Sequence, residues 1–265
     1  MKLVGAFPRF RARDGRDPRE LASMDLATHL DDPSRKTRYV RTMFDIVAPG
    51  YDRFTRAFSF GMDRSWKAAL IVEAGKRTRQ KATILDLACG TGDLGIALGR
   101  LTSAQLVVGA DLSSNMLAEA RTRAGNEQAF ALVACDILFT CLADSSVDVV
   151  TVGYGLRNTA DPRKALAEIA RVLKPGGVLA SLDFHRPVSR VWRGLFLWYI
   201  LHAGRLGGWL WHREPVTYGY IAPSIRRYFS VPEFEEALAE AGFAVEWRAQ
   251  PLRGAIAIHI SRRIA

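Results

Sequence analysis

Short apolar runs alternate with amphipathic stretches over most of the chain after residue 82. Five runs of strand length lie at 83–87, 106–110, 129–135, 147–152 and 177–184. Stretches of helical length separate them, and this alternation predicts a doubly wound parallel sheet with helices on both faces. Runs at 243–248 and 255–261 predict a closing antiparallel pair. The pattern therefore predicts an α/β fold with a mostly parallel, seven-stranded, Rossmann-like sheet.

Capping residues place the ends of the helices around these strands. Asp161-Pro162 predicts a helix start with an acidic cap and a proline in the first turn, and Lys174-Pro-Gly-Gly177 predicts its end. Ser230 and Glu233 have the spacing of a capping box at the start of the last helix, and Gly242 follows its end.

The chain before the first strand divides into two parts. Residues 1–35 lack apolar periodicity and include the arginine-rich run Arg9-Phe-Arg-Ala-Arg13, which predicts a mobile basic extension. Residues 40–70 have helical periodicity in pieces. We therefore predict a single domain over 36–265, with a helical lid inserted near 186–228.

A glycine-rich turn, Ala88-Cys-Gly-Thr-Gly-Asp93, follows the first predicted strand. Gly90 and Gly92 allow positive φ and a close approach of the backbone to a ligand. Asp111 ends the second strand, where a carboxylate can accept hydrogen bonds from both hydroxyls of a ribose. The layout predicts a nucleotide-shaped pocket, and the alternative is a turn that only packs helix against strand.

Two carboxylates near this turn favour a cationic ligand. Asp86 precedes it and Asp93 follows it, and both would repel the diphosphate of a dinucleotide even though the glycines match the G-x-G-x-x-G pattern. S-adenosylmethionine carries an ammonium and a sulfonium and no phosphate, so we predict that it is the cofactor. Asp136 is expected at the adenine amino group, with Ile137 against the ring. The predicted cofactor-binding residues are Asp86, Ala88, Gly90, Thr91, Gly92, Asp111, Leu112, Met116, Asp136 and Ile137.

Composition is that of one soluble enzyme, with 265 residues, 49% hydrophobic and 24% charged. The net charge of +10 is concentrated locally, since residues 186–213 contain five arginines and no acid. The predicted sheet region is nearly neutral and has no nucleic-acid motif, which argues against a nucleic-acid partner. Three cysteines without metal spacing indicate a reducing compartment and no metal site, and we expect a cytoplasmic protein.

Four motifs resemble the quinone-ring C-methyltransferases, which are class I enzymes that use S-adenosylmethionine. The motifs are Phe44-Asp-x4-Gly-Tyr-Asp52, Ser59-Phe-Gly-Met-Asp-Arg-Ser-Trp66, Gly155-Leu-Arg-Asn158 and Ala165-Leu-x2-Glu-x2-Arg-Val-Leu-Lys-Pro-Gly-Gly177. The resemblance covers roughly residues 38–262. It implies methylation of the ring of demethylmenaquinol or of the matching ubiquinol precursor, and it places Arg157 and Asn158 in the site.

Ring methylation on carbon requires an ionised or nearly ionised ring hydroxyl. The permanent charge of Arg157 would stabilise the developing oxyanion, although a guanidinium is a poor base. Tyr51 is predicted to cap the pocket, and His185, directly after the fifth strand, is predicted as a base or an acceptor-binding donor. The alternatives are an arginine held by local ion pairs and an aromatic residue in the core.

The chain departs from the family pattern in segments expected to face the acceptor. Phe54-Thr55 replaces a Met-Asn pair, Asp63 replaces a histidine, and Asp183-Phe-His-Arg-Pro187 replaces Glu-Phe-Ser-Lys-Pro. These changes keep open an alternative in which a methyltransferase of the same build acts on a soluble aromatic or another small molecule.

Residues 191–211 bear on the partner question. Tryptophans at 192, 198, 209 and 211 alternate with arginines, and the longest uncharged run, 194–204, is too short to span a bilayer. Such a segment suits a helix at the lipid interface, where a lipophilic quinol resides. That interpretation places the protein at the inner face of the membrane. The alternative is an internal lid or a homodimer contact.

Overall fold

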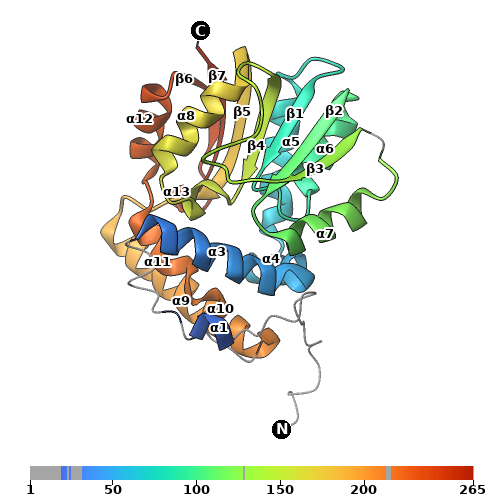
Figure 1. Ribbon diagram of the computed structural model, residues 1–265. Helices are drawn as coiled ribbons and strands as arrows, with labels where there is room; N and C mark the ends of the chain where they lie inside the picture. Colours follow the sequence, from blue (N-terminus) through green and yellow to red (C-terminus); the bar gives the residue numbers. More distant parts are fainter. Residues whose placement is uncertain (1–18, 23, 25–31, 128, 213–215, 265) are drawn as a thin grey trace.

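The computed structural model describes residues 19–22, 24, 32–127, 129–212 and 216–264 (Figure 1). Its centre is a seven-stranded sheet in the order β3-β2-β1-β4-β5-β7-β6. Strands β1 to β5 run parallel, and β7 lies antiparallel between β5 and β6. The predicted fold class is confirmed. The strands are β1 (Thr83–Leu87), β2 (Leu106–Asp111), β3 (Phe130–Ala134), β4 (Val147–Gly153), β5 (Leu173–Phe184), β6 (Phe243–Ala249) and β7 (Ile256–Arg263).

Helices cover both faces of the sheet because its strands bury apolar side chains on alternate sides. In β4, Val149 belongs to the core under α5 and α6, whereas Val150 belongs to the core under α8 and α12. Helix α7 packs against β2 and β3. The helices named here are α5 (Met62–Gly75), α6 (Asp93–Thr102), α7 (Ser114–Ala124), α8 (Pro162–Val172) and α12 (Val231–Glu240).

The predicted helix caps are present, with one shifted boundary. At the start of α8, the Asp161 carboxylate accepts a hydrogen bond from the backbone N–H of Lys164 at 3.1 Å. Ser230 and Glu233 form the capping box of α12. The end of α8 was predicted at 174–177, but the helix ends at Val172 because Leu173 already pairs with Val147 as the first residue of β5.

A layer of helices lies below the carboxyl edge of the parallel strands (Figure 1). It contains the predicted helical segment near 186–228, and Tyr39 of α3 meets Tyr220 there with ring centroids 5.5 Å apart. Its members are α1 (Arg19–Ala22), α3 (Pro33–Val47), α4 (Tyr51–Phe58), α9 (Arg190–His212), α10 (Val216–Gly219) and α11 (Ile221–Arg227).

Two described parts of the predicted 1–35 extension, residues 19–22 and 33–35, are helical. Leu21 in α1 is fully buried and belongs to the same core as Tyr39 and Met43, so this turn of helix is packed. Pro33 already begins α3, where the Asp32 carboxylate accepts from the N–H groups of Ser34 and Arg35. Residues 1–18, 23 and 25–31 lie outside the described residues.

Within the described ranges, no helix combines the length and apolar character needed to cross a membrane.

Candidate active site

The turn between β1 and α6 has the left-handed backbone that its sequence predicts. Gly90 and Gly92 have φ of 52° and 78°, and Ala88 has φ of 49°. Tyr154, which follows β4, also has positive φ, at 58°. Non-glycine residues adopt this conformation rarely and at some cost. Ala88 and Tyr154 therefore mark the ends of β1 and β4, two adjacent strands, as a specialised part of the carboxyl edge.

Two carboxyl groups lie beside this turn, the buried Asp86 and the half-buried Asp111. The Asp86 carboxylate accepts from the backbone N–H of Gly95 at 2.9 Å and from the Thr151 hydroxyl at 2.6 Å. Burial raises the pKa of Asp86 to about 7, although these hydrogen bonds oppose the shift.

Asp111 at the end of β2 ties two segments of backbone together. Its carboxylate accepts from the N–H groups of Gly90 and Ser113, each at 2.8 Å. Burial raises the pKa of Asp111 to about 6. The same carboxylate that borders the predicted ribose position thus also fixes the glycine turn.

Asp93 differs from these two groups because its charge is paired within the chain. Its Oδ2 lies 2.7 Å from the Nζ of Lys67, which is 3.7 Å from Asp63. Lys67 therefore balances part of the negative charge that Asp93 is predicted to offer a cationic ligand. Lys67 comes from α5 and was not predicted.

The first cavity opens at this edge and encloses about 1010 Å³ of empty space, part of it open solvent. The predicted cofactor residues that line it are Asp86, Ala88, Gly90, Thr91, Asp111, Leu112, Met116, Asp136 and Ile137. Gly92 is the exception: it is not among the lining residues. A Cβ at Gly92 would lie 3.2–3.3 Å from Phe130, Ala120 and Ile96. Glycine is therefore needed at this position for its positive φ and for close packing. We refer to this space as the donor cavity.

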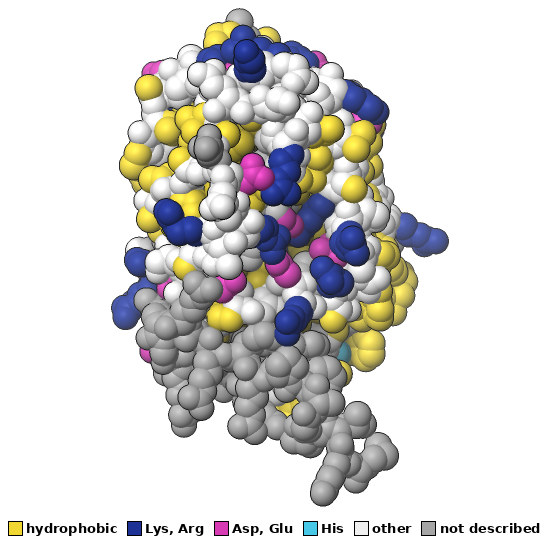
Figure 2. Space-filling view, turned by 90° about the vertical axis from the view of Figure 1, so that its right-hand side faces the viewer, with side chains coloured by type: hydrophobic (Ala, Val, Ile, Leu, Met, Phe, Trp, Pro, Cys, Tyr) yellow, Lys and Arg dark blue, Asp and Glu magenta, His cyan; other side chains and the backbone are white. Residues whose placement is uncertain are grey.

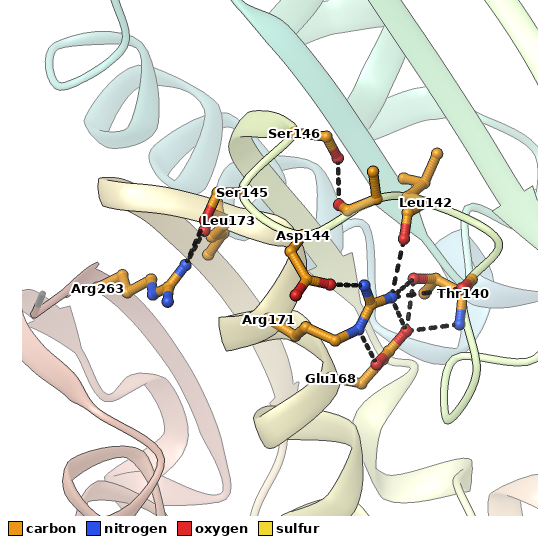
Figure 3. A network of polar contacts seen from close by, with 10 residues as sticks. Thr140, Leu142, Asp144, Ser145, Ser146, Glu168, Arg171, Leu173 and Arg263 are labelled. Carbon is orange, nitrogen blue, oxygen red and sulfur yellow. Dashed lines mark hydrogen bonds and ion pairs between the residues drawn. The ribbon is translucent and has the colours of Figure 1, made fainter.

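A polar network holds the loop that leads away from Asp136 and Ile137 (Figure 3). The guanidinium of Arg171 on α8 donates to the carbonyl oxygen of Leu142 at 2.9 Å and also pairs with Glu168 at 2.7 Å and with Asp144. Glu168 accepts from the backbone N–H of Thr140 at 2.7 Å. Helix α8 thereby fixes the side of the donor cavity where the adenine ring was predicted.

A second cavity of about 630 Å³ of empty space adjoins the first, and Phe44, Tyr51 and Tyr154 line both. Its walls are mainly aromatic and include Phe54, which stacks on Tyr218 at a centroid distance of 3.4 Å. We call it the ring cavity. Burial raises the pKa of Tyr51, so this phenol is neutral at pH 7.

Arg157 and Asn158 lie on different sides of this junction. Asn158 lines the donor cavity and Arg157 lines the ring cavity, and the guanidinium donates to the Asn158 side-chain oxygen at 2.6 Å. The structure thus brings the Tyr51, Arg157 and Asn158 of the sequence prediction together where the two cavities meet.

Asp183 holds Arg157 from behind. Its carboxylate accepts from the Arg157 backbone N–H at 3.0 Å and lies 3.3 Å from the Arg157 Nε. The guanidinium also lies 5.3 Å from the Phe184 ring centre. Arg157 is therefore held by an ion pair, which was the alternative to a role in the site, and it also lines the ring cavity. Burial raises the pKa of Asp183, and Arg157 opposes this shift.

Two further polar residues lie near this junction: Lys36, which was not predicted, and Asp63, which belongs to a segment expected to face the acceptor. Lys36 of α3 donates to the carbonyl oxygen of Arg157 at 3.3 Å, and burial lowers the pKa of Lys36 to about 8. Asp63 is a buried wall of the ring cavity and accepts from the Ser59 hydroxyl at 2.9 Å. The contact between Lys36 and Arg157 joins residues 121 positions apart in the sequence, which local spacing does not encode.

The prediction that His185 serves as a base or an acceptor-binding donor is wrong. Its side chain is 1% exposed and lies among Tyr228, Phe234 and His259, with ring centroids 5.0–5.8 Å apart. It lines neither cavity described above. Burial lowers the pKa of His185 to about 3, so the imidazole is a neutral core group.

The part of the chain that the structure describes contains no group of three or more His, Cys, Asp or Glu side chains arranged to hold a metal ion.

Comparison with known proteins adds to this geometry. A family model described as the ubiE/COQ5 methyltransferase family matches residues 33–263. A 2-phytyl-1,4-naphtoquinone methyltransferase of Trichormus variabilis is 37% identical over 216 residues, covering 78% of this chain and 91% of that protein. A demethylmenaquinone methyltransferase of Lactiplantibacillus plantarum is 33% identical over 214 residues, covering 79% and 90%. A solved SAM-dependent methyltransferase of Aquifex aeolicus shares the fold, with a TM-score of 0.54, 18% identity, and coverage of 94% of this chain and 100% of that one.

Proposed function

Because the chain belongs to the ubiE/COQ5 methyltransferase family, we propose that it transfers the methyl group of S-adenosylmethionine to a ring carbon of a prenylated hydroquinone. The observation that carries this proposal is the junction of the two cavities. An apolar, aromatic-lined ring cavity meets a carboxylate-lined donor cavity at Tyr51, and the buried guanidinium of Arg157 faces the ring cavity.

The residues present suit the donor. Asp86 is buried and Asp111 is half-buried beside a turn of positive φ, and the ionised forms of both carboxyl groups would be favoured by a nearby ammonium or sulfonium. Asp111 would hold the ribose, while Asp136 and Ile137 would meet the adenine. When bound, S-adenosylmethionine supplies an electrophilic methyl group.

The chain's own groups suit a hydroquinone as the acceptor. A phenolic hydroxyl has a pKa near 10, and a fixed positive charge lowers it by stabilising the oxyanion. Arg157 supplies that charge, and Asp183 positions it. The ionised ring is nucleophilic at the neighbouring carbon. The new carbon–methyl bond forms as the sulfur–methyl bond breaks, and the ring carbon then loses its proton. Since a guanidinium is a poor base, we assign the proton to water.

The relatives favour a naphthoquinol ring, since the names of the two described above specify a phytyl-naphthoquinone and demethylmenaquinone. The test is incubation of the purified protein with S-adenosylmethionine and a reduced, short-tailed 2-demethylnaphthoquinone, followed by mass spectrometry. We expect a product heavier by one CH₂ unit, since the methyl group replaces a ring hydrogen. A quinone pool of normal composition in a strain lacking the gene would contradict the proposal.

The second candidate function is a methyltransferase for a soluble aromatic. It is favoured by the departures from the family pattern, because Phe54, Asp63 and Asp183 all lie at or beside the ring cavity. Efficient methylation of tail-less phenols, with no activity on any naphthoquinol, would support this function instead. A nucleic-acid partner is not favoured: on the face in Figure 2, Lys and Arg side chains are interspersed with Asp and Glu.

We further propose that α9 contacts a lipid surface. Five of its apolar residues are exposed and follow helical spacing, namely Val191, Leu195, Trp198, Leu206 and Trp209. Arginines flank this stripe and there is no acid between 186 and 213, which suits an interfacial helix. The side chain of Trp211, also part of the predicted segment, lies outside the described residues. Contact with a second copy of the chain is the competing outcome.

A further inference from the structure

A third cavity continues from the ring cavity toward α9. It encloses about 760 Å³ of empty space, part of it open to solvent, and it shares Phe58, Ser59, Trp66 and Phe184 with the ring cavity. The shared walls make the two spaces neighbours. We call this third space the α9 passage.

The walls of the α9 passage are apolar. Helix α9 contributes Trp192, Leu195, Phe196, Tyr199 and Ile200, and none of the side chains that line the passage carries a charge. The donor cavity, on the other side of the ring cavity, has Lys67, Asp86 and Asp111 in its walls. An apolar chain attached to a ring in the ring cavity is therefore accommodated by the passage and disfavoured by the donor cavity.

The outer end of the passage lies on an exposed apolar surface. Phe60 is 77% exposed and Leu195 is 60% exposed, and both line the passage. The Tyr199 hydroxyl donates to the carbonyl oxygen of Phe58 at 3.0 Å, which ties α9 to the end of α4. The two walls are thus held at a fixed spacing, and the opening is continuous with the apolar stripe of α9.

We infer that the α9 passage binds the isoprenoid tail of the acceptor and leads it from the ring cavity to the exposed face of α9. The inference rests on the proposed function and specifies where the tail lies. The ring-proximal isoprene units occupy the passage, and the distal units leave between Phe60 and Leu195. If α9 lies on a bilayer, the distal tail remains in lipid while the ring reaches Arg157.

The test compares two acceptors in detergent solution, where contact with a bilayer plays no part. One is a tail-less naphthoquinol and the other carries two isoprene units. The variant Leu195→Arg places a charge at the opening. We expect the ratio of kcat/KM for the tailed acceptor to that for the tail-less acceptor to fall at least tenfold, mainly through KM.

Leu101→Arg is the matched control, since Leu101 is also a half-exposed leucine but lies on α6, outside all three cavities. The ratio should stay at the wild-type value in this variant. An equal ratio in both variants would overturn the inference. If neither acceptor is methylated by the wild-type protein, the proposed function itself fails, so the two failures are distinguishable.

A binding measurement that does not depend on turnover completes the test. Trp192 lines the passage, and its indole N–H donates to the carbonyl oxygen of Leu252 at 2.8 Å. A bromine on the first isoprene unit should quench its fluorescence on contact. We expect at least twofold less quenching in Trp192→Phe than in the wild type. Trp66 also lines the passage, so equal quenching in the wild type, in Trp192→Phe and in Trp66→Phe would show that the tail lies elsewhere.

Discussion

The residues that meet at the cavity junction owe their chemistry to burial. Burial raises the pKa of Asp86 to about 7 and that of Asp111 to about 6, and it makes the Tyr51 phenol harder to ionise. The guanidinium of Arg157 lies in the same enclosed region, with its Nε 3.3 Å from the Asp183 carboxylate. The site therefore combines two carboxyl groups, whose ionisation a bound cation would favour, with the permanent positive charge of Arg157.

The first prediction concerns pH and donor affinity. Both carboxyl groups ionise as the pH rises through about 6 to 7, and their ionised forms attract a cation. The affinity for S-adenosylmethionine should therefore increase by about tenfold between pH 5.5 and 8, since each unit of pKa shift corresponds to a factor of ten. Isothermal titration measures it. S-adenosylhomocysteine, which lacks the sulfonium, should show a smaller increase, and a flat profile for both would contradict the assignment.

A second prediction separates the roles of the two cavities. Arg157→Lys keeps a charge but loses the planar fork that meets Asp183 and Asn158. We expect kcat for ring methylation to fall by about 10²-fold, the typical effect of removing one oxyanion-stabilising donor. Affinity for S-adenosylhomocysteine should remain within about twofold, because Arg157 does not line the donor cavity. A large loss of that affinity with unchanged kcat would contradict this assignment and show that Arg157 acts on the donor cavity.

The third prediction uses the buried His185. Its pKa is lowered to about 3 in the folded protein, so the unfolded chain binds the proton more tightly. Stability is therefore lost as the pH falls through about 6.5 toward 3. His185→Phe should show a smaller loss of unfolding free energy between pH 7 and 5 in urea titrations, and it should keep methyl transfer. Loss of activity in a folded variant would restore a chemical role for this histidine.

At the scale of elements, sequence periodicity predicted the strands of the sheet well, but it did not predict the direction in which individual side chains point. All seven predicted strands are present within a few residues. Strands buried on both faces, such as β4, appear as nearly continuous apolar runs, whereas the edge strand β6 alternates between buried and more exposed residues. His185 was misassigned because its place after a strand does not determine which way its side chain points. The pairing of Lys67 with Asp93 links two helices through tertiary packing, so no local pattern could reveal it.

The fourth prediction belongs to α9. Replacing the exposed Trp198 and Leu206 together by glutamate should abolish flotation with anionic vesicles, since it removes apolar area and adds negative charge to the stripe. The control replaces Val72, which is exposed on α5, by glutamate and should float like the wild type. Unaltered flotation of the double variant would remove the lipid-contact proposal. Loss of dimers instead would identify a subunit contact.

At the scale of the whole molecule, the helical layer and the sheet are joined through the donor cavity. The Ser113 hydroxyl donates to Asp45 of α3 at 2.6 Å, and the Asn115 side-chain amide donates to the carbonyl oxygen of Asp45 at 2.9 Å. Phe44 and Tyr51 of the helical layer line the same cavity as Asp86 and Asp111 of the sheet. A ligand in this cavity contacts both layers at once.

The fifth prediction follows from this junction. Binding of S-adenosylhomocysteine should slow hydrogen exchange in α3 and α4 as well as in the turn after β1, because a ligand stabilises every segment that its site requires. Asp45→Ala should reduce the protection of α3 at a saturating ligand concentration. Protection confined to the turn and α7 would show that the helical layer is not coupled to the site.

Tyr51 is a wall of both cavities, and this has a consequence for the divergence of such enzymes. Any substitution that moves its ring to admit a differently shaped acceptor also changes the space left for the donor. Selection for a new acceptor can therefore act on Phe54 or Ser59, which line the ring cavity but not the donor cavity, whereas a change at Tyr51 alters the binding of both reaction partners.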